Sequence, residues 1–306
     1  MKEGSDSMIF TPQAEGKSEQ AKAADAQLDR LTQEEVDALK DRLWSSQEMI
    51  ALEAVATTPP VVGEGDSWFD YAPGIDILDH LKNLGHTIDK IADAGDTLEN
   101  MIFGTKFSGS FIREPNPLDR TIQRMRQRNA RILLFSGGGN DIAGDELLAL
   151  LNHKDMGIGP VRTDYMNFIF GTATKRAYQH LITRVRAEVH PNAQVVAHGY
   201  GHAIPDGRAV KILFFRFAGP WLRPSLTAKG YVIAEERRAI ITQLADRFNQ
   251  TLSELATEPA TRDNFHYLDL RNLIRDEDWV NELHLKNSAY LTVAREFDRV
   301  IRSIPV

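Results

Sequence analysis

The 306-residue sequence contains no cysteine and carries no excess of positive charge. Without cysteine the chain cannot form disulfides, use a thiol nucleophile, or ligate zinc or iron–sulfur clusters through thiolates. Its 36 Lys+Arg against 43 Asp+Glu give a net charge of −7. The sequence therefore lacks the basic footprint typical of nucleic-acid-binding proteins, and we expect no nucleic-acid partner.

Long hydrophobic runs are also missing. No stretch reaches the roughly 18 apolar residues that a membrane-spanning helix needs, so we expect no membrane span. The first residues are polar and contain no apolar core of a signal peptide. The sequence therefore predicts a cytoplasmic protein, although export that needs no cleaved signal would leave the same pattern.

The N-terminal residues 1–59 are expected to form an extension to an α/β domain at residues 60–306. Residues 1 to about 25 are polar and predict a flexible arm. Thr32 and Glu35 then fit a capping box, and apolar residues follow at helical spacing until Pro59-Pro60. This amphipathic helix either packs on the domain or serves as a dimerisation or docking helix, which makes it the candidate contact for a homo-oligomer.

Strand and helix signals alternate from residue 61 onward. We predict strands at 61–65, 87–91, 131–135, 194–197 and 265–270. We predict helices at 75–84, 97–103, 118–129, 142–151, 165–189, 235–255 and 288–304. Such alternation is typical of a mainly parallel sheet covered by helices on both faces, a three-layer α/β/α sandwich.

Residues suited to catalysis follow four of the predicted strands. In such sheets, ligands bind at the carboxyl ends of the strands. The motifs there are Gly65-Asp66-Ser67, Ala94-Gly95-Asp96, Gly137-Gly138-Gly139-Asn140-Asp141 and Asn281-Glu282-Leu283-His284.

These residue types fit nucleophilic catalysis by a serine. The hydroxyl of Ser67 is a weak nucleophile that needs a neighbouring base, and His284 can be that base because an imidazole titrates near neutral pH. A developing oxyanion needs fixed donors. The backbone amides of Ser67 and Gly95 and the side-chain amide of Asn140 can supply three.

The four motifs, in this order, resemble the GDSL/SGNH hydrolase family of serine esterases and lipases. Gly65-Asp66-Ser67 is similar to the block that holds the nucleophile, Gly95 to the second-block glycine, Gly138-Gly139-Asn140-Asp141 to GxND, and His284 to the fifth-block histidine. The resemblance implies a flavodoxin-like sandwich and a serine acyl-enzyme, with no metal and no cofactor. It assigns the nucleophile to Ser67, the base to His284, and the oxyanion hole to Ser67, Gly95 and Asn140.

One position departs from the family pattern. The fifth block usually reads Asp-x-x-His, but Asn281 stands three residues before His284. Two carboxylates lie nearby, Asp278 and Glu282. In a turn the −3 position faces the histidine, whereas in an extended segment the −2 position does. We expect Asn281 to take the place of the family's Asp, with Asp278, ahead of Glu282, assisting through Asn281 or water.

The expected function is a serine esterase acting on short acyl, acetyl-type esters of small molecules or carbohydrates, because no long apolar tunnel is suggested. A lipase or thioesterase for longer acyl groups is the alternative among enzymes. A non-catalytic binding module on the same scaffold is the alternative in another class, and the missing Asp is the feature in its favour.

Other polar and aromatic residues have structural interpretations. His198 and His202 follow a strand, but two glycines and Tyr200 between them indicate a loop, so we expect them to line the pocket or cap a turn and not to bind metal. The aromatic residues after the nucleophile, among them Tyr71, either wall the acyl or sugar site or pack the next helix.

Overall fold

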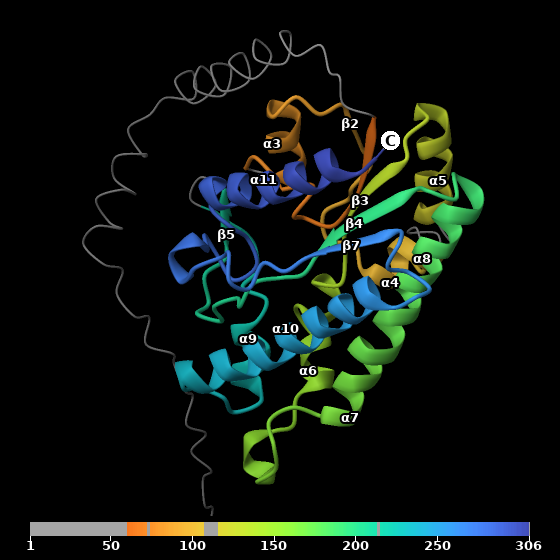
Figure 1. The fold of residues 1–306 in the computed structure, drawn as a ribbon. Coiled ribbons are helices and arrows are strands. Elements are labelled where there is room, and N and C mark those ends of the chain that lie inside the picture. The colour runs from red at the N-terminus through yellow and green to blue at the C-terminus, as the bar shows by residue number, and fades with distance from the viewer. Residues whose placement is uncertain (1–59, 72–73, 107–115, 213–214, 306) are drawn as a thin grey trace, which may run out of the picture. The chain divides into compact units, whose positions relative to one another are not determined.

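A parallel sheet lies at the centre of the computed structural model (Figure 1). The structure describes residues 60–71, 74–106, 116–212 and 215–305. Within them the sheet has the strand order β2-β1-β3-β4-β7. The strands are β1 (Val61–Gly65), β2 (Ile88–Lys90), β3 (Ile132–Ser136), β4 (Gln194–His198) and β7 (Phe265–Leu268). All neighbouring strands pair in parallel, and each predicted strand is confirmed.

Helices cover both faces of this sheet. On one face lie α3 (Ile77–Asn83) and α11 (Asn287–Ser303), which pack against each other. On the other lie α4 (Leu98–Phe103), α5 (Pro117–Arg128), α8 (Lys175–Glu188) and α10 (Ala234–Thr257). The predicted three-layer α/β/α class, with the flavodoxin-like strand order, is therefore confirmed.

The shorter elements lie between the main ones. They are η1 (Asn140–Ile142), α6 (Glu146–Leu150), η2 (Lys154–Met156), α7 (Thr163–Met166), η3 (Asn167–Thr174), β5 (Val210–Ile212), β6 (Phe215–Ala218), α9 (Arg223–Ala228) and η4 (Asp276–Asp278). The single helix predicted over 165–189 is composed of α7, a π-helical segment η3 and α8. The antiparallel hairpin β5–β6 was not predicted, because its two strands are short and lie next to glycine and proline.

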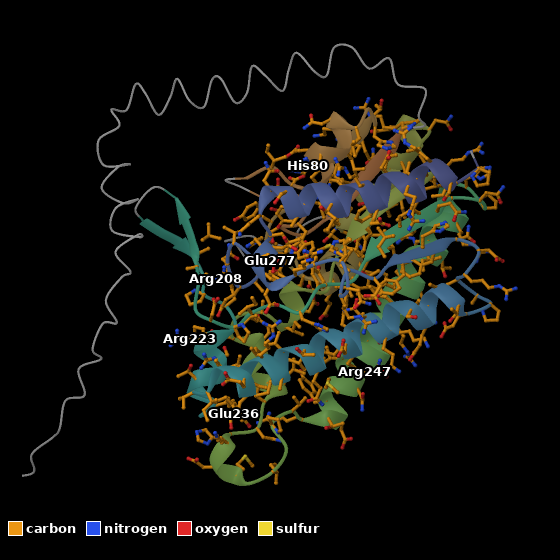
Figure 2. All side chains as sticks on the ribbon, turned by 60° about the vertical axis from the view of Figure 1, so that its left-hand side comes forward. His80, Arg208, Arg223, Glu236, Arg247 and Glu277 are labelled. Carbon is orange, nitrogen blue, oxygen red and sulfur yellow. The ribbon has the colours of Figure 1, made fainter. Side chains whose placement is uncertain are left out.

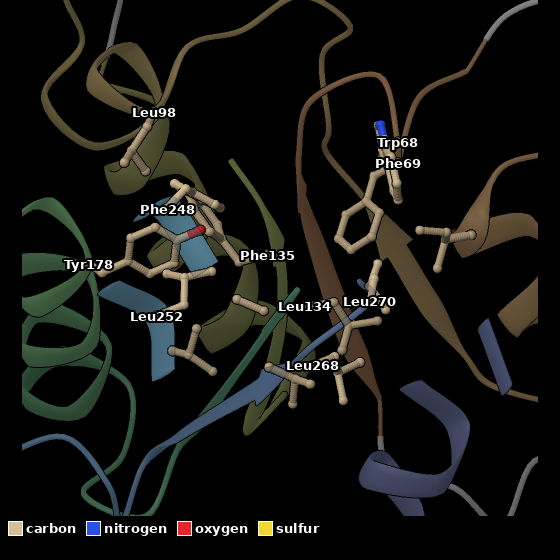
Figure 3. Packing of buried hydrophobic residues seen from close by; sticks show 14 of the residues in the cluster. Trp68, Phe69, Leu98, Leu134, Phe135, Tyr178, Phe248, Leu252, Leu268 and Leu270 are labelled. Atoms are coloured by element: carbon tan, nitrogen blue, oxygen red, sulfur yellow. The ribbon is translucent and has the colours of Figure 1, made fainter. Parts of the chain in front are cut away.

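The central strands are continuous apolar runs because both of their faces lie in the core. Residues 132–135 of β3 are fully buried, because helices cover both faces of a parallel sheet. Phe69 packs against Phe297 of α11 with ring centroids 5.8 Å apart. Phe135 packs against Tyr178 of α8 at 5.5 Å. Figure 3 shows Phe69, Phe135 and Tyr178, with Phe69 and Tyr178 on opposite sides of the sheet.

The N-terminal extension lies outside the described residues. The boundary near residue 60, the arm, the amphipathic helix and its role in an oligomer therefore stay predictions. Among the described helices, none has the length and apolar character needed to cross a membrane.

The topology brings the motifs together. From β1 the chain passes to β2 on one side and later to β3 on the other, so the carboxyl ends of β1 and β3 flank the point where the strand order reverses. Ligand crevices of open α/β sheets form at this point.

Candidate active site

The Ser67 loop begins where β1 ends. The backbone N–H of Asp66 donates to Ser136 O at 2.9 Å, which extends the pairing of β1 with β3 by one step. The Asp66 carboxylate then accepts from the backbone N–H of Trp68 at 3.0 Å. The chain turns tightly around this carboxylate, and Ser67 between the two residues stays partly exposed.

His284 approaches Ser67 from the loop that follows β7. Its Nε2 lies 2.8 Å from Ser67 Oγ, although 217 residues separate them in the chain. The indole N–H of Trp68 donates to Leu283 O at 3.0 Å and ties the two loops together. A hydroxyl and an imidazole at this distance are in hydrogen-bond contact, which is the arrangement that a nucleophile and its base require.

Asn281 fixes the orientation of the His284 ring. Its Oδ1 accepts from the backbone N–H of Leu283 at 3.0 Å and of His284 at 2.9 Å. Because both backbone groups are donors, the Asn281 atom that they contact is the amide oxygen and not the amide nitrogen. The same atom lies 3.0 Å from His284 Nδ1, so Nδ1 carries the hydrogen and the lone pair of Nε2 faces Ser67. The segment is a turn, with the Val280 N–H donating to His284 O at 3.0 Å, which is why position −3 faces the ring.

The two carboxylates near His284 have other partners. Asp278 Oδ2 accepts from the backbone N–H of Arg275 at 2.8 Å. Within the described residues no hydrogen bond joins Asp278 to Asn281 or His284. The structure therefore brings Asn281 to the imidazole but not Asp278, and the expected assistance by Asp278 gains no support.

Glu282 binds a different segment. Its Oε1 accepts from the backbone N–H groups of Gly207 at 2.9 Å and Arg223 at 3.0 Å, and its Oε2 from those of Trp221 at 2.6 Å and Leu222 at 2.7 Å. Arg208 and Arg223, before and after the hairpin β5–β6, lie on the same side of the molecule in Figure 2. Glu282 thus holds both ends of the hairpin segment to the histidine loop and does not contact the imidazole.

Burial sets the charge of His284. The side chain is 4% exposed, and this desolvation lowers its pKa to about 3. Among the described residues no carboxylate forms a hydrogen bond with the ring. The imidazole is therefore neutral at physiological pH and free to accept a proton.

Two aromatic side chains enclose the imidazole. The Tyr71 ring stacks on it at 4.4 Å and 25°, and Trp221 meets it edge-on at 5.6 Å and 70°. The Tyr71 phenol is also hydrogen-bonded to the Asn281 side chain, while burial raises its pKa and keeps it protonated. The sequence left two interpretations of Tyr71 open, as a wall of the site or as packing against the next helix. Its position four residues after Ser67 was the signal that it could belong to the site.

The three expected oxyanion donors come from the ends of β1, β2 and β3. The N–H of Asp93 donates to Gly65 O at 3.0 Å, which sets the Gly95 turn beside the Ser67 loop. Gly95 has φ +91°, a conformation that favours glycine. Asn140 Nδ2 donates to Asp96 O at 2.9 Å, and its second hydrogen stays available. In the described part of the chain the backbone N–H groups of Ser67 and Gly95 have no hydrogen-bond partner.

A buried polar network lies beneath Ser67. Asp66 Oδ1 is 2.7 Å from Ser136 Oγ, which is 2.9 Å from His198 Nε2. His198 Nδ1 donates to Gly199 O at 2.7 Å, and the Tyr200 hydroxyl donates to Asp66 Oδ2 at 2.5 Å. His198 is fully buried in this network and does not line the pocket.

His202 has separate partners. Its Nε2 lies 2.9 Å from Asp246, which also pairs with Arg271 at 3.0 Å. Among the described residues no group of three or more His, Asp or Glu side chains is arranged to hold a metal ion.

An apolar pocket of about 70 Å³ adjoins Ser67 and Asn140. Gly138 forms part of its lining, and a Cβ at that residue would lie 2.4 Å from the Phe248 ring, so glycine is required where the chain passes this helix. The apolar wall includes Trp68, Tyr200, Leu222, Ile241, Phe248 and Trp279.

Comparison with solved structures finds similar folds among esterases and an acetyltransferase. A family 3 carbohydrate esterase from Clostridium thermocellum is 14% identical, with a TM-score of 0.45 over 81% of this chain and 98% of that one. The periplasmic domain of a lipopolysaccharide acetyltransferase from Salmonella ser. Paratyphi A is 12% identical, with a TM-score of 0.46 over 81% and 85%. AlinE4, an SGNH-hydrolase family esterase, is 13% identical, with a TM-score of 0.29 over 82% and 100%.

No protein-family model matches the chain, and no curated protein is similar to it in sequence. At these identities an activity does not transfer from one protein to another. The function therefore has to be inferred from the geometry of the site.

Proposed function

We propose that this chain is a serine ester hydrolase that works through a covalent acyl-enzyme. The contact between His284 Nε2 and Ser67 Oγ, with Nδ1 held by Asn281, is the observation that supports it most. His284 would accept the hydroxyl proton while Ser67 Oγ bonds to the ester carbonyl carbon. His284 would then give that proton to the departing alkoxide. A water molecule releases the acyl group by the same two proton transfers in reverse order.

The tetrahedral intermediate carries a negative charge that needs fixed donors. The backbone N–H groups of Ser67 and Gly95 and the side chain of Asn140 have hydrogens available for it. Donors held in place before the reaction stabilise an oxyanion without reorganisation at the moment of attack.

Short acyl esters are the proposed substrates. The small apolar pocket beside Ser67 favours a short hydrocarbon group over the long acyl chain of a lipid. The other part of the ester, whether a simple alcohol or a carbohydrate, would lie on the open side of the nucleophile.

The deciding experiment measures hydrolysis of p-nitrophenyl acetate and p-nitrophenyl butyrate by purified protein. Replacing Ser67 by Ala should lower kcat by several orders of magnitude while circular dichroism stays unchanged. Ser253→Ala, on the exposed face of α10, is the matched control and should keep full activity. Equal rates for the wild type and a folded Ser67→Ala protein would refute the proposal. They would favour a binding module on a hydrolase scaffold.

A further inference from the structure

The position of the pocket relative to Ser67 and His284 determines where the acyl part and the alcohol part of the ester lie. Ser67 and Asn140 line the pocket, but His284 does not. In the proposed reaction the leaving alcohol takes its proton from His284 Nε2, so it has to lie on the side of Tyr71 and Trp221, which enclose that ring. The acyl group, bonded to the same carbonyl carbon, then points into the pocket.

The lining of the pocket is mostly apolar and therefore favours a hydrocarbon group. Ile241, Ala245 and Phe248 stand one helical turn apart on α10 and present one apolar face to it. The Tyr200 hydroxyl in the wall already donates to Asp66. A hydroxylated group would replace few of its hydrogen bonds to water there, because most of the lining is apolar, whereas an alkyl chain gains from burial.

The volume limits the length of the chain. A space of about 70 Å³ is about half of the roughly 150 Å³ of a cavity that holds a benzene molecule, so it accommodates on the order of three carbon atoms. An acetyl group would leave most of that space empty. An acyl chain of eight or more carbons would have to displace part of the wall.

We propose that this pocket is an acyl-binding site, and that the enzyme prefers esters of unbranched acyl groups of about four carbons over acetyl and long-chain esters. This inference rests on the proposed function, because it requires Ser67 to be acylated. Ala245 is 8% exposed and contributes only a methyl group to the wall, so a larger side chain at this position would shorten the pocket.

A series of p-nitrophenyl esters from acetate through butyrate, hexanoate and octanoate to dodecanoate tests the inference. We expect kcat/KM to rise about fourfold for each added methylene up to butyrate and to fall for the longer esters. Ala245→Leu should lower kcat/KM for butyrate about tenfold more than it lowers kcat/KM for acetate. Ala239→Leu, on the exposed side of the same helix, should leave the profile unchanged.

The outcomes distinguish the inference from the function on which it rests. If no ester is hydrolysed in a Ser67-dependent way, the proposed function fails. If Ser67-dependent hydrolysis is highest for acetate or dodecanoate, or if folded Ala245→Leu keeps the wild-type profile, only the acyl-site inference fails. Should Ala245→Leu not fold, the wild-type series decides together with Ala203→Val, a second small lining residue whose enlargement should likewise lower kcat/KM for butyrate more than for acetate.

Discussion

Replacing Asn281 by Asp should change the pH dependence of catalysis. The carboxylate would stand where the amide oxygen lies, 3.0 Å from His284 Nδ1. With charge centres about 4 Å apart, an effective dielectric constant near 20 gives about 4 kcal/mol, or about three pKa units in favour of the imidazolium. The pKa of His284, which burial holds at about 3 in the wild type, should then rise to about 6.

The sign of the effect follows from the role of the base. A protonated imidazole cannot accept the Ser67 proton, so kcat/KM falls as the pH drops through the pKa of His284 in the free enzyme. We expect the wild type to keep its rate down to about pH 4 and Asn281→Asp to lose half of its rate near pH 6. Above pH 7 the variant should be faster by about tenfold to a hundredfold, because the carboxylate stabilises the imidazolium formed during attack.

The assay is a pH–rate profile for p-nitrophenyl butyrate between pH 4 and pH 9. Asn192→Asp introduces the same charge on an exposed loop before β4 and should leave the acidic limb unchanged. If the acidic limbs of the wild type and a folded Asn281→Asp protein coincide, the carboxylate does not face the ring, and the assignment of Asn281 is wrong.

Three further variants probe neighbouring contacts. Asn140→Ala should lower kcat by roughly 10² to 10³ with little change in KM, and an effect on KM alone would argue for substrate binding. Tyr71→Leu should lower kcat about tenfold through loss of the stacked ring, whereas Tyr71→Phe should retain most of it; equal losses would refute stacking as the cause. Glu282→Ala removes the acceptor of four backbone N–H groups and should lower the free energy of unfolding in urea by about 3–5 kcal/mol, with a loss below about 1 kcal/mol contradicting the clamp.

The sheet was predictable because its signals are local. Residues 132–135 form a continuous apolar run, which the helices on both faces make necessary, and a glycine-rich turn follows it directly. The motifs at the strand ends were visible for the same reason. Since parallel strands end at one edge, the order of the motifs was enough to expect Ser67, Gly95 and Asn140 near one another.

The contacts that the sequence did not predict join segments that lie far apart in the chain. Glu282 binds backbone groups about 60 residues earlier, and no side-chain pattern marks a backbone N–H as a partner. The periodicity of α10 predicts that Ile241 and Phe248 are buried, but it does not reveal that they border a pocket. Whether position −2 or −3 faces His284 depended on a turn that only backbone geometry settles.

The number of hydrogens in the network below Ser67 determines the charge at the site. His198 Nδ1 has to donate, because its partner is the carbonyl of Gly199. If the ring is neutral, Nε2 takes the hydrogen of Ser136, and the 2.7 Å contact between Ser136 and Asp66 then needs a hydrogen on the carboxyl group. If the ring is charged, Ser136 donates to an ionised Asp66. Both arrangements contain one proton more than a carboxylate beside a neutral imidazole.

Burial raises the pKa of Asp66 and lowers that of His198 to about 4. Both shifts favour the arrangement in which Asp66 holds the proton and His198 is neutral. Full ionisation of Asp66, one residue from Ser67, would set a negative charge beside the oxyanion of the proposed reaction. With the proton on Asp66, the network below Ser67 carries no net charge, and the three proposed oxyanion donors would act without an opposing charge.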